Sequence, residues 1–129
     1  MSEERPRIRL SSVALPLLVV RGDELDPEVL ESDARRFRRR FEAWGRFGIS
    51  ALAAADESEV DALCETRLER FEIVLVFERL KLESFGIEVV PTFRRPHVTL
   101  AHPDLGVLVN ALQRCEHGER PNPYHVAEP

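Results

Sequence analysis

The sequence lacks any apolar run of the length that a membrane-spanning helix needs, about 18 residues or more. The segment from Ala14 to Val20 is apolar, but it is short and is flanked by Arg9 and Arg21. This pattern is typical of a strand and not of the hydrophobic region of a signal peptide. We therefore expect a protein that has no membrane partner.

Cysteine is scarce, since Cys64 and Cys115 are the only two. Their spacing matches no redox or metal motif, and without an export signal they indicate a reduced, cytoplasmic protein. Cys115, His117 and His125 near the C-terminus also match no zinc spacing. The sequence predicts neither a metal site nor another cofactor.

Lysine is almost absent, because 17 of the 18 basic residues are arginine. The formal net charge of −5 argues against a general nucleic-acid binder, but a local basic patch can still attract a phosphate ligand. Five arginines lie between positions 35 and 40. Such a run either contacts nucleic acid or forms the solvated face of an amphipathic helix, which is the commoner case. Few aromatic residues lie outside the expected core, so no stacking platform for single strands is evident.

The 129 residues, of which 43% are hydrophobic, are enough for one globular domain with a real core. We expect a single domain over residues 1–129, ending in an irregular, proline-rich tail over residues 116–129. The clearest element is a helix from Asp26 to Trp44. Asp26 is its N-cap, Pro27 its first residue and Gly45 its stop.

Strands and helices alternate along the rest of the chain. The patterns predict two further main helices, which start at Asp56 or Ser58 and at Leu105. A short helix is expected over 80–85. Strands are expected within 8–20 and over 48–54, 73–77, 87–93 and 98–101, with 73–77 buried at the centre of the sheet. The fold class is therefore α/β (α+β), with a mixed sheet of about five to six strands covered by three main helices.

One short segment carries the most chemistry. After Pro96, an apolar strand holds His97 and Thr99, and the two-residue period of a strand places both side chains on one face. The imidazole can move a proton near neutral pH, and the hydroxyl can hydrogen-bond a phosphoryl oxygen. The pair predicts a site for phosphate chemistry, in which we also expect His102 to act as an acid or base.

The string from Arg95 to Ala101 resembles the second signature of the 2H phosphoesterase family, which includes RNA 2′,3′-cyclic phosphodiesterases and RNA 2′,5′-ligase-like proteins. The resemblance covers residues 85–103. It implies a bilobed fold in which two His-x-Thr/Ser motifs face each other across a cleft. One histidine would deprotonate water, the other would protonate the leaving oxygen, and the hydroxyls would hold the phosphate.

The chain departs from this pattern, because only one of its four histidines stands in a His-x-Thr motif. The nearest counterpart of the first motif is Arg9-Leu10-Ser11, and arginine stays protonated, so it cannot act as a general base. Arginine can still clamp a phosphate, and Arg9, Arg94 and Arg95 are the expected ligand-binding residues. His125 is an alternative second acid or base if the tail folds back on His97. The preferred function is binding or processing of an RNA end or another nucleotide-type ligand.

A second interpretation comes from the first half of the chain. Arg21, followed by a helix and by Ser50, resembles ADP-ribosyltransferases of the arginine–serine–glutamate type. The resemblance implies that Arg21 holds the phosphates of NAD and that Ser50 orders the site, with Glu88 as the glutamate. The third interpretation is a non-catalytic protein partner. It would pair through a sheet edge at Val89 to Phe93 or through the helix that carries Trp44.

Overall fold

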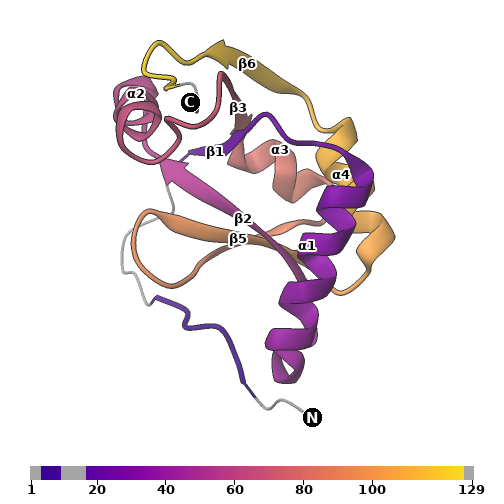
Figure 1. The fold of residues 1–129 in the computed structure, drawn as a ribbon. Coiled ribbons are helices and arrows are strands. Elements are labelled where there is room, and N and C mark those ends of the chain that lie inside the picture. The colour runs from indigo at the N-terminus through magenta and orange to yellow at the C-terminus, as the bar shows by residue number, and fades with distance from the viewer. Residues whose placement is uncertain (1–3, 10–16, 127–129) are drawn as a thin grey trace.

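Six strands lie side by side in one sheet. The computed structural model describes residues 4–9 and 17–126, and part of the strand expected within 8–20 lies outside them. The strands are β1 (Leu18–Gly22), β2 (Phe47–Ala54), β3 (Ile73–Glu78), β4 (Glu88–Pro91), β5 (His97–His102) and β6 (His117–Pro121). The helices are α1 (Pro27–Arg40), α2 (Glu57–Thr66), α3 (Arg79–Ser84) and α4 (Leu105–Arg114), with a 3-10 turn at Glu42–Trp44 (Figure 1). The α/β class with a single helix-covered sheet is confirmed.

The strand order is β4-β5-β2-β1-β3-β6, and every neighbouring pair is antiparallel. We expected a mixed sheet, because the alternation of strands and helices does not show in which direction each connection returns. Strand β3 lies inside the sheet, between β1 and β6, although not at its centre.

The prediction of an irregular tail over residues 116–129 is wrong for the first part of this segment. Residues 117–121 form β6, which pairs with β3 from Phe77↔His117 to Ile73↔Pro121. The apolar strand β3 has a free edge that needs hydrogen-bond partners, and this need outweighs the low strand propensity of His-Gly-Glu-Arg-Pro. Pro121 is tolerated because it stands at the end of an edge strand.

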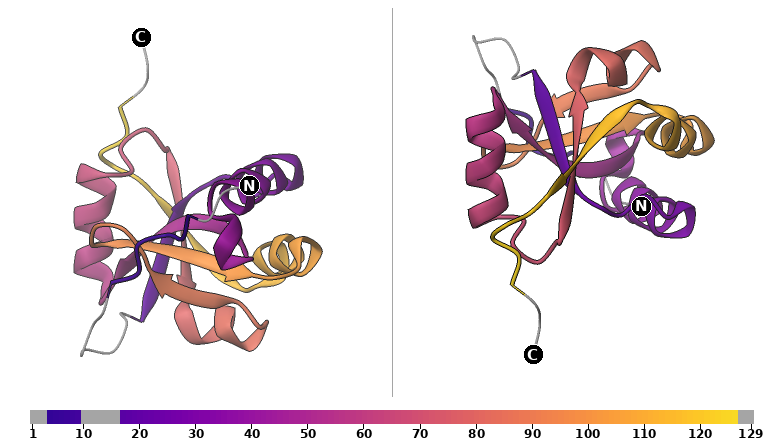
Figure 2. Two further views of the ribbon diagram at one scale, coloured as in Figure 1. Left: turned by 90° about the horizontal axis from the view of Figure 1, so that it is seen from below. Right: turned by 90° about the horizontal axis from the view of Figure 1, so that it is seen from above.

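The two faces of the sheet are covered unequally. Helices α1, α3 and α4 pack on one face in a large apolar cluster, which includes Leu30, Leu82 and Leu108. Helix α2 packs on the other face, where Val60 and Cys64 belong to a smaller cluster. Figure 2 shows α2 on one side of the sheet, and α1 and α4 on the other. Because only α2 covers the second face, much of that face is left for a surface site.

The helix boundaries follow the capping residues. The Asp26 carboxylate accepts a hydrogen bond from the Glu28 amide at 2.8 Å, and Asp56 accepts one from the Glu59 amide at 3.0 Å. After α1 the chain forms the 3-10 turn and then reverses at Gly45, whose φ of 70° suits glycine. Helix α2 ends at Thr66, and residues 67–72 form a loop.

Candidate functional site

A gap between β1 and β2 creates the site. The two strands pair only from Leu18↔Ala54 to Val20↔Leu52. Beyond this point Arg21 of β1 has no partner in β2, while Ser50 of β2 still pairs with Thr99 of β5. The strands therefore diverge, and the space between them opens toward the face that α2 covers only in part.

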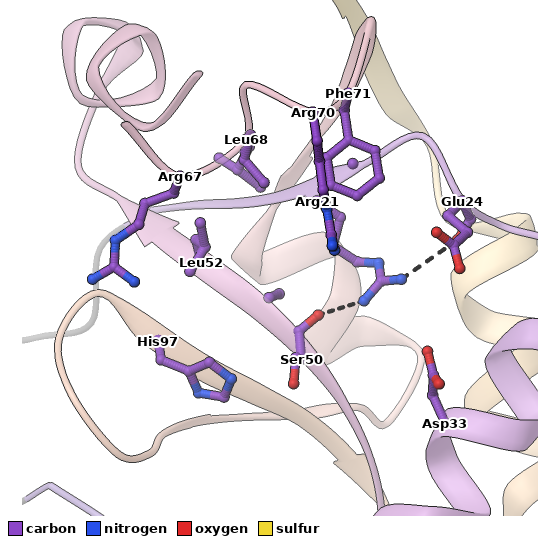
Figure 3. A pocket seen from close by; sticks show the side chains of 13 residues that line it. Arg21, Glu24, Asp33, Ser50, Leu52, Arg67, Leu68, Arg70, Phe71 and His97 are labelled. Atoms are coloured by element: carbon purple, nitrogen blue, oxygen red, sulfur yellow. Dashed lines mark hydrogen bonds between the residues drawn. The ribbon is translucent and has the colours of Figure 1, made fainter. Parts of the chain in front are cut away.

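We call this space the arginine hollow. Its volume is about 300 Å³, at the lower end of the roughly 300–1,000 Å³ of small-molecule sites. Figure 3 shows its side chains, which come from β1, β2, β5, α1 and the loop after α2. The polar or charged members are Arg21, Glu24, Asp33, Ser50, Arg67, Arg70 and His97. Three arginines and one histidine thus converge on a single hollow in an acidic chain.

Arg21 bridges the gap between the strands. Its guanidinium donates to the backbone carbonyl of Ser50 and, at 3.4 Å, to that of Glu24 (Figure 3). Its Nε is buried and has no hydrogen-bond partner. Burial lowers the pKa of Arg21 from its usual value, although Glu24 and Asp33 act in the opposite direction. Arg21 is thus a partly buried cation whose Nε makes no hydrogen bond.

Arg67 and Arg70 come from the loop that follows α2. Leu68 packs into the smaller core cluster beneath them, with the half-buried Phe71 against it. The Arg70 guanidinium lies over the Phe71 ring, 4.7 Å from its centroid. In the part of the chain that the structure describes, neither arginine forms an ion pair. Gly22 makes this packing possible, because a Cβ there would lie 2.3 Å from the Phe71 ring.

The C-terminal segment holds this loop in place. The Asn122 side-chain amide donates to the carbonyls of Cys64, Leu68 and Phe71, at 3.3, 2.9 and 3.1 Å. Backbone hydrogen bonds join Asn122 to Glu72 at 2.8 Å and Val126 to Glu69 at 2.9 Å. We call residues 122–126 the C-terminal clamp. The tail folds back on this loop and not beside His97.

A buried chain of hydroxyls orients His97. The Thr99 and Thr92 hydroxyl oxygens are 2.7 Å apart, and Thr92 Oγ1 is 2.9 Å from His97 Nδ1. Both threonines are 0% exposed. His97 and Thr99 do share one face of β5, but Thr99 cannot hold a phosphate, because its hydroxyl is buried against Thr92. That expectation is corrected, and Thr92 joins the site as a residue that the His-x-Thr motif does not reveal.

The direction of this chain sets the tautomer of His97. We assign Thr99 as the donor to Thr92 and Thr92 as the donor to Nδ1, because this order gives each hydroxyl proton an acceptor. The opposite order leaves the buried Thr99 proton without an acceptor among the hydrogen bonds of the described residues. With this assignment the proton of neutral His97 lies on Nε2, and His97 is one of the residues that line the arginine hollow.

The surroundings of His97 favour its neutral form. Burial is the main cause that lowers its pKa below the usual 6.5, and the positive charges of Arg9 and Arg67 add to this effect, while a hydrogen bond with the Thr92 backbone opposes it. Arg9, expected to bind the ligand, lines neither the arginine hollow nor the other hollow described below; its amide donates to Pro91 O at 2.8 Å, and its guanidinium donates to Thr92 O at 3.4 Å. A bound anion would instead raise the pKa of His97, because a nearby negative charge stabilises the protonated imidazole.

A second space adjoins the first, and we call it the aromatic hollow. Its volume is about 310 Å³, and it shares Arg21, Asp33 and Ser50 with the arginine hollow. The other lining residues are Arg36, Phe37, Arg40, Phe41, Gly48 and Phe93. We expected few aromatic residues outside the core, but three aromatic residues, Phe37, Phe41 and Phe93, line this hollow. Phe41 is buried, whereas Phe37 and Phe93 are partly exposed.

Four other residues expected at the site lie outside both hollows. Arg94 and Arg95 are exposed in the turn before β5. His102 points to the opposite face from His97, because the two lie five positions apart on one strand, and its Nδ1 accepts from the Asp104 amide at 2.8 Å. His125 Nδ1 lies 3.2 Å from the Glu69 carbonyl. Neither histidine reaches His97, so neither supplies the second acid or base.

The residues of the ADP-ribosyltransferase interpretation are only partly brought together. Arg21 and Ser50 meet at the gap. Glu88 lies on the edge strand β4 and pairs with Arg46, with Nε and Oε2 2.8 Å apart, and it lines neither hollow. The acids beside Arg21 are instead Glu24 and Asp33. The arrangement therefore lacks the glutamate that this interpretation requires.

Three further features concern the expected sheet edge, metal binding and membrane-spanning helices. Residues 7–9 pair with the end of the edge strand β4 and the residues that follow it. Ile8 bridges to Thr92, and Phe93 N donates to Arg7 O at 2.8 Å. Over residues 4–9 and 17–126, no group of three or more His, Cys, Asp or Glu could hold a metal ion. No described helix is long and apolar enough to cross a membrane.

Several site residues could not be found from sequence. Arg67 and Arg70 follow the apparent end of a helix with no motif around them, and Asp33 lies within the arginine-rich helix. Their common location depends on the gap between β1 and β2, which has no local sequence signal. Comparisons with protein-family models, with curated proteins and with solved structures found no match to this chain.

Proposed function

We propose that the chain binds a phosphodiester or nucleotide-type ligand, such as an RNA end or a cyclic nucleotide, in the arginine hollow. The observation that carries this proposal is the convergence of Arg21, Arg67, Arg70 and His97 on one hollow in a chain of net charge −5. A general surface excess of positive charge cannot explain such a cluster. The guanidinium groups of this cluster are planar, forked hydrogen-bond donors of the kind that recognise phosphate.

The site supports binding better than efficient catalysis. Guanidinium groups from β1 and from the 67–72 loop would hold the phosphate oxygens, and His97 Nε2–H would donate to a bridging or leaving oxygen. No second histidine lies in either hollow. A reaction at this site would therefore have one acid without the partner base, and we expect turnover to be slow compared with a two-histidine enzyme.

A ligand screen by thermal unfolding tests this function first. A bound ligand raises the Tm by mass action, and the three probes are a 2′,3′-cyclic nucleotide, NAD and a short single-stranded RNA. A shift with the cyclic nucleotide or the RNA that is reduced in His97→Ala supports the proposal. A shift with NAD alone would favour the transferase interpretation. The absence of any shift would favour a protein partner.

A matched pair of double variants separates the site from general charge. Arg67→Ala/Arg70→Ala removes two charges from the hollow, whereas Arg35→Ala/Arg39→Ala removes the same charge from exposed positions on α1. We expect the first pair to weaken RNA binding at least tenfold and the second to change it little. The salt dependence of log K should also decrease by about 1.4 in slope for two lost phosphate contacts on a single strand. Equal losses in both pairs would contradict the proposed site.

A further inference from the structure

The aromatic hollow adjoins the arginine hollow. The two share Arg21, Asp33 and Ser50, so a ligand whose phosphate lies beside Arg21 has its next chemical group over the aromatic rings. We infer that the aromatic hollow is a nucleobase subsite and that the ligand is a single-stranded RNA segment of at least two nucleotides lying across both hollows. This inference rests on the proposed function.

A ladder of rings connects the two hollows. The ring centroids of Phe37 and Phe41 are 4.8 Å apart, those of Phe41 and Phe93 5.8 Å, and those of Phe93 and His97 5.1 Å. Phe41 is only 2% exposed, whereas Phe37 and Phe93 are partly exposed and can offer a surface to a ligand. Exposed aromatic rings beside basic groups are what single-strand binding sites use, because every base has a face that can stack.

The backbone is held in an unusual conformation to present one of these rings. Phe93 has a φ of 56°, in the left-handed region that non-glycine residues rarely adopt. Strained residues of this kind persist where the surrounding structure fixes them, and they cluster at ligand sites. Gly48 contributes on the other side, because a Cβ there would lie 2.6 Å from the Phe37 ring and 2.7 Å from Thr99 Cγ2. The Phe37 ring therefore lies directly on the sheet.

The charges around the aromatic hollow fit a base within a nucleic-acid chain. Arg36 and Arg40 line it, and the Arg40 guanidinium lies 4.7 Å from the centroid of the Phe41 ring. Arginine over an aromatic ring adds a cation–π contribution to base stacking.

Asp33 at the junction points to a hydroxyl beside the phosphate. Its carboxylate lines both hollows, and its nearest ion pair, with Arg36 at 3.7 Å, is long and exposed. A carboxylate repels phosphate but accepts a hydrogen bond from a ribose 2′-OH, the group that distinguishes RNA from DNA. The order arginine hollow, Asp33, aromatic hollow thus matches the order phosphodiester, ribose, base.

The test compares four labelled tetramers by fluorescence anisotropy: r(A)4, d(A)4, r(U)4 and an abasic ribose tetramer with the same phosphates. With the wild-type protein, we expect the abasic tetramer to bind about tenfold more weakly than r(A)4, and d(A)4 several-fold more weakly. Phe93→Leu, which keeps an apolar side chain of similar bulk, should remove most of the advantage of r(A)4 over the abasic tetramer. Phe37→Leu is a second variant in case the first fails to fold.

Asp33→Asn tests the ribose contact separately, with Arg67→Ala/Arg70→Ala as the comparison. The asparagine should reduce the preference for r(A)4 over d(A)4, while the double variant should weaken all tetramers by a similar factor. If the abasic tetramer binds as tightly as r(A)4, or if both leucine variants keep the base preference, the base subsite is refuted while the phosphate site stands. If no tetramer binds, the proposed function itself fails.

Discussion

Removing one hydroxyl from the buried chain tests how His97 is held. Thr92→Val keeps the shape of the side chain but leaves the buried Thr99 hydroxyl and His97 Nδ1 without their partner, at the 2.7 and 2.9 Å contacts. An unsatisfied buried polar group costs about 1–3 kcal/mol. We therefore expect the free energy of unfolding to fall by about 2 kcal/mol, which lowers the Tm by several degrees.

The assay is urea unfolding of a double-mutant cycle. Thr92→Val/Thr99→Val removes both hydroxyls, and replacing both partners by apolar groups is nearly neutral, so the double variant should recover part of the stability lost in Thr92→Val. Thr92→Ser keeps the hydroxyl and is the matched control. If Thr92→Val is as stable as the wild type, or if the two substitutions are simply additive, the buried chain is not coupled and our assignment of the His97 tautomer has no basis.

The remaining predictions concern acidity, the clamp and the buried cation. Because burial lowers the pKa of His97 in the folded state, the unfolded chain binds more protons at this residue than the folded chain does once the pH falls below about 6.5. The free energy of unfolding should therefore fall as the pH drops from about 6.5 toward the pKa of the folded state. This loss should be smaller in His97→Gln, as measured by urea unfolding at several pH values. Asn122→Ala removes four side-chain hydrogen bonds and should lower the stability by about 2–4 kcal/mol and weaken RNA binding, since the 67–72 loop loses its support, whereas Asn110→Ala at an exposed position of α4 should change neither. Arg21→Met, which removes the buried charge but keeps the long side chain, should raise or preserve the Tm while RNA binding falls more than tenfold, and a stable variant with full binding would contradict the role of Arg21.

Local signals in the sequence predict the elements of this fold well. Asp26, Pro27 and Gly45 define the ends of the first helical region, and the apolar run at Ile73 gives the strand β3. The exception is β6, whose residues have no strand pattern of their own. That strand forms because β3 offers it an edge, and such an effect depends on the assembled sheet.

The site could be predicted only in part, because half of it depends on long-range geometry. The His-x-Thr pattern correctly places His97 and Thr99 on one face, and Arg9 is brought close to them. The pattern cannot show that Thr92, from the neighbouring strand, takes up the Thr99 hydroxyl. The sequence also gives no sign of the gap at Arg21, because no local pattern distinguishes strands that diverge from strands that stay paired.

The C-terminal clamp has a consequence for the synthesis of the chain. The 67–72 loop leaves the ribosome well before the C-terminal clamp that holds it, because Asn122 follows Leu68 by 54 residues. Chains are made from the N-terminus and can begin to fold as they emerge. Until residues 122–126 arrive, the side-chain hydrogen bonds from Asn122 that hold the loop of Arg67 and Arg70 cannot form. The proposed RNA site would therefore be complete only after the last strand of the sheet is in place.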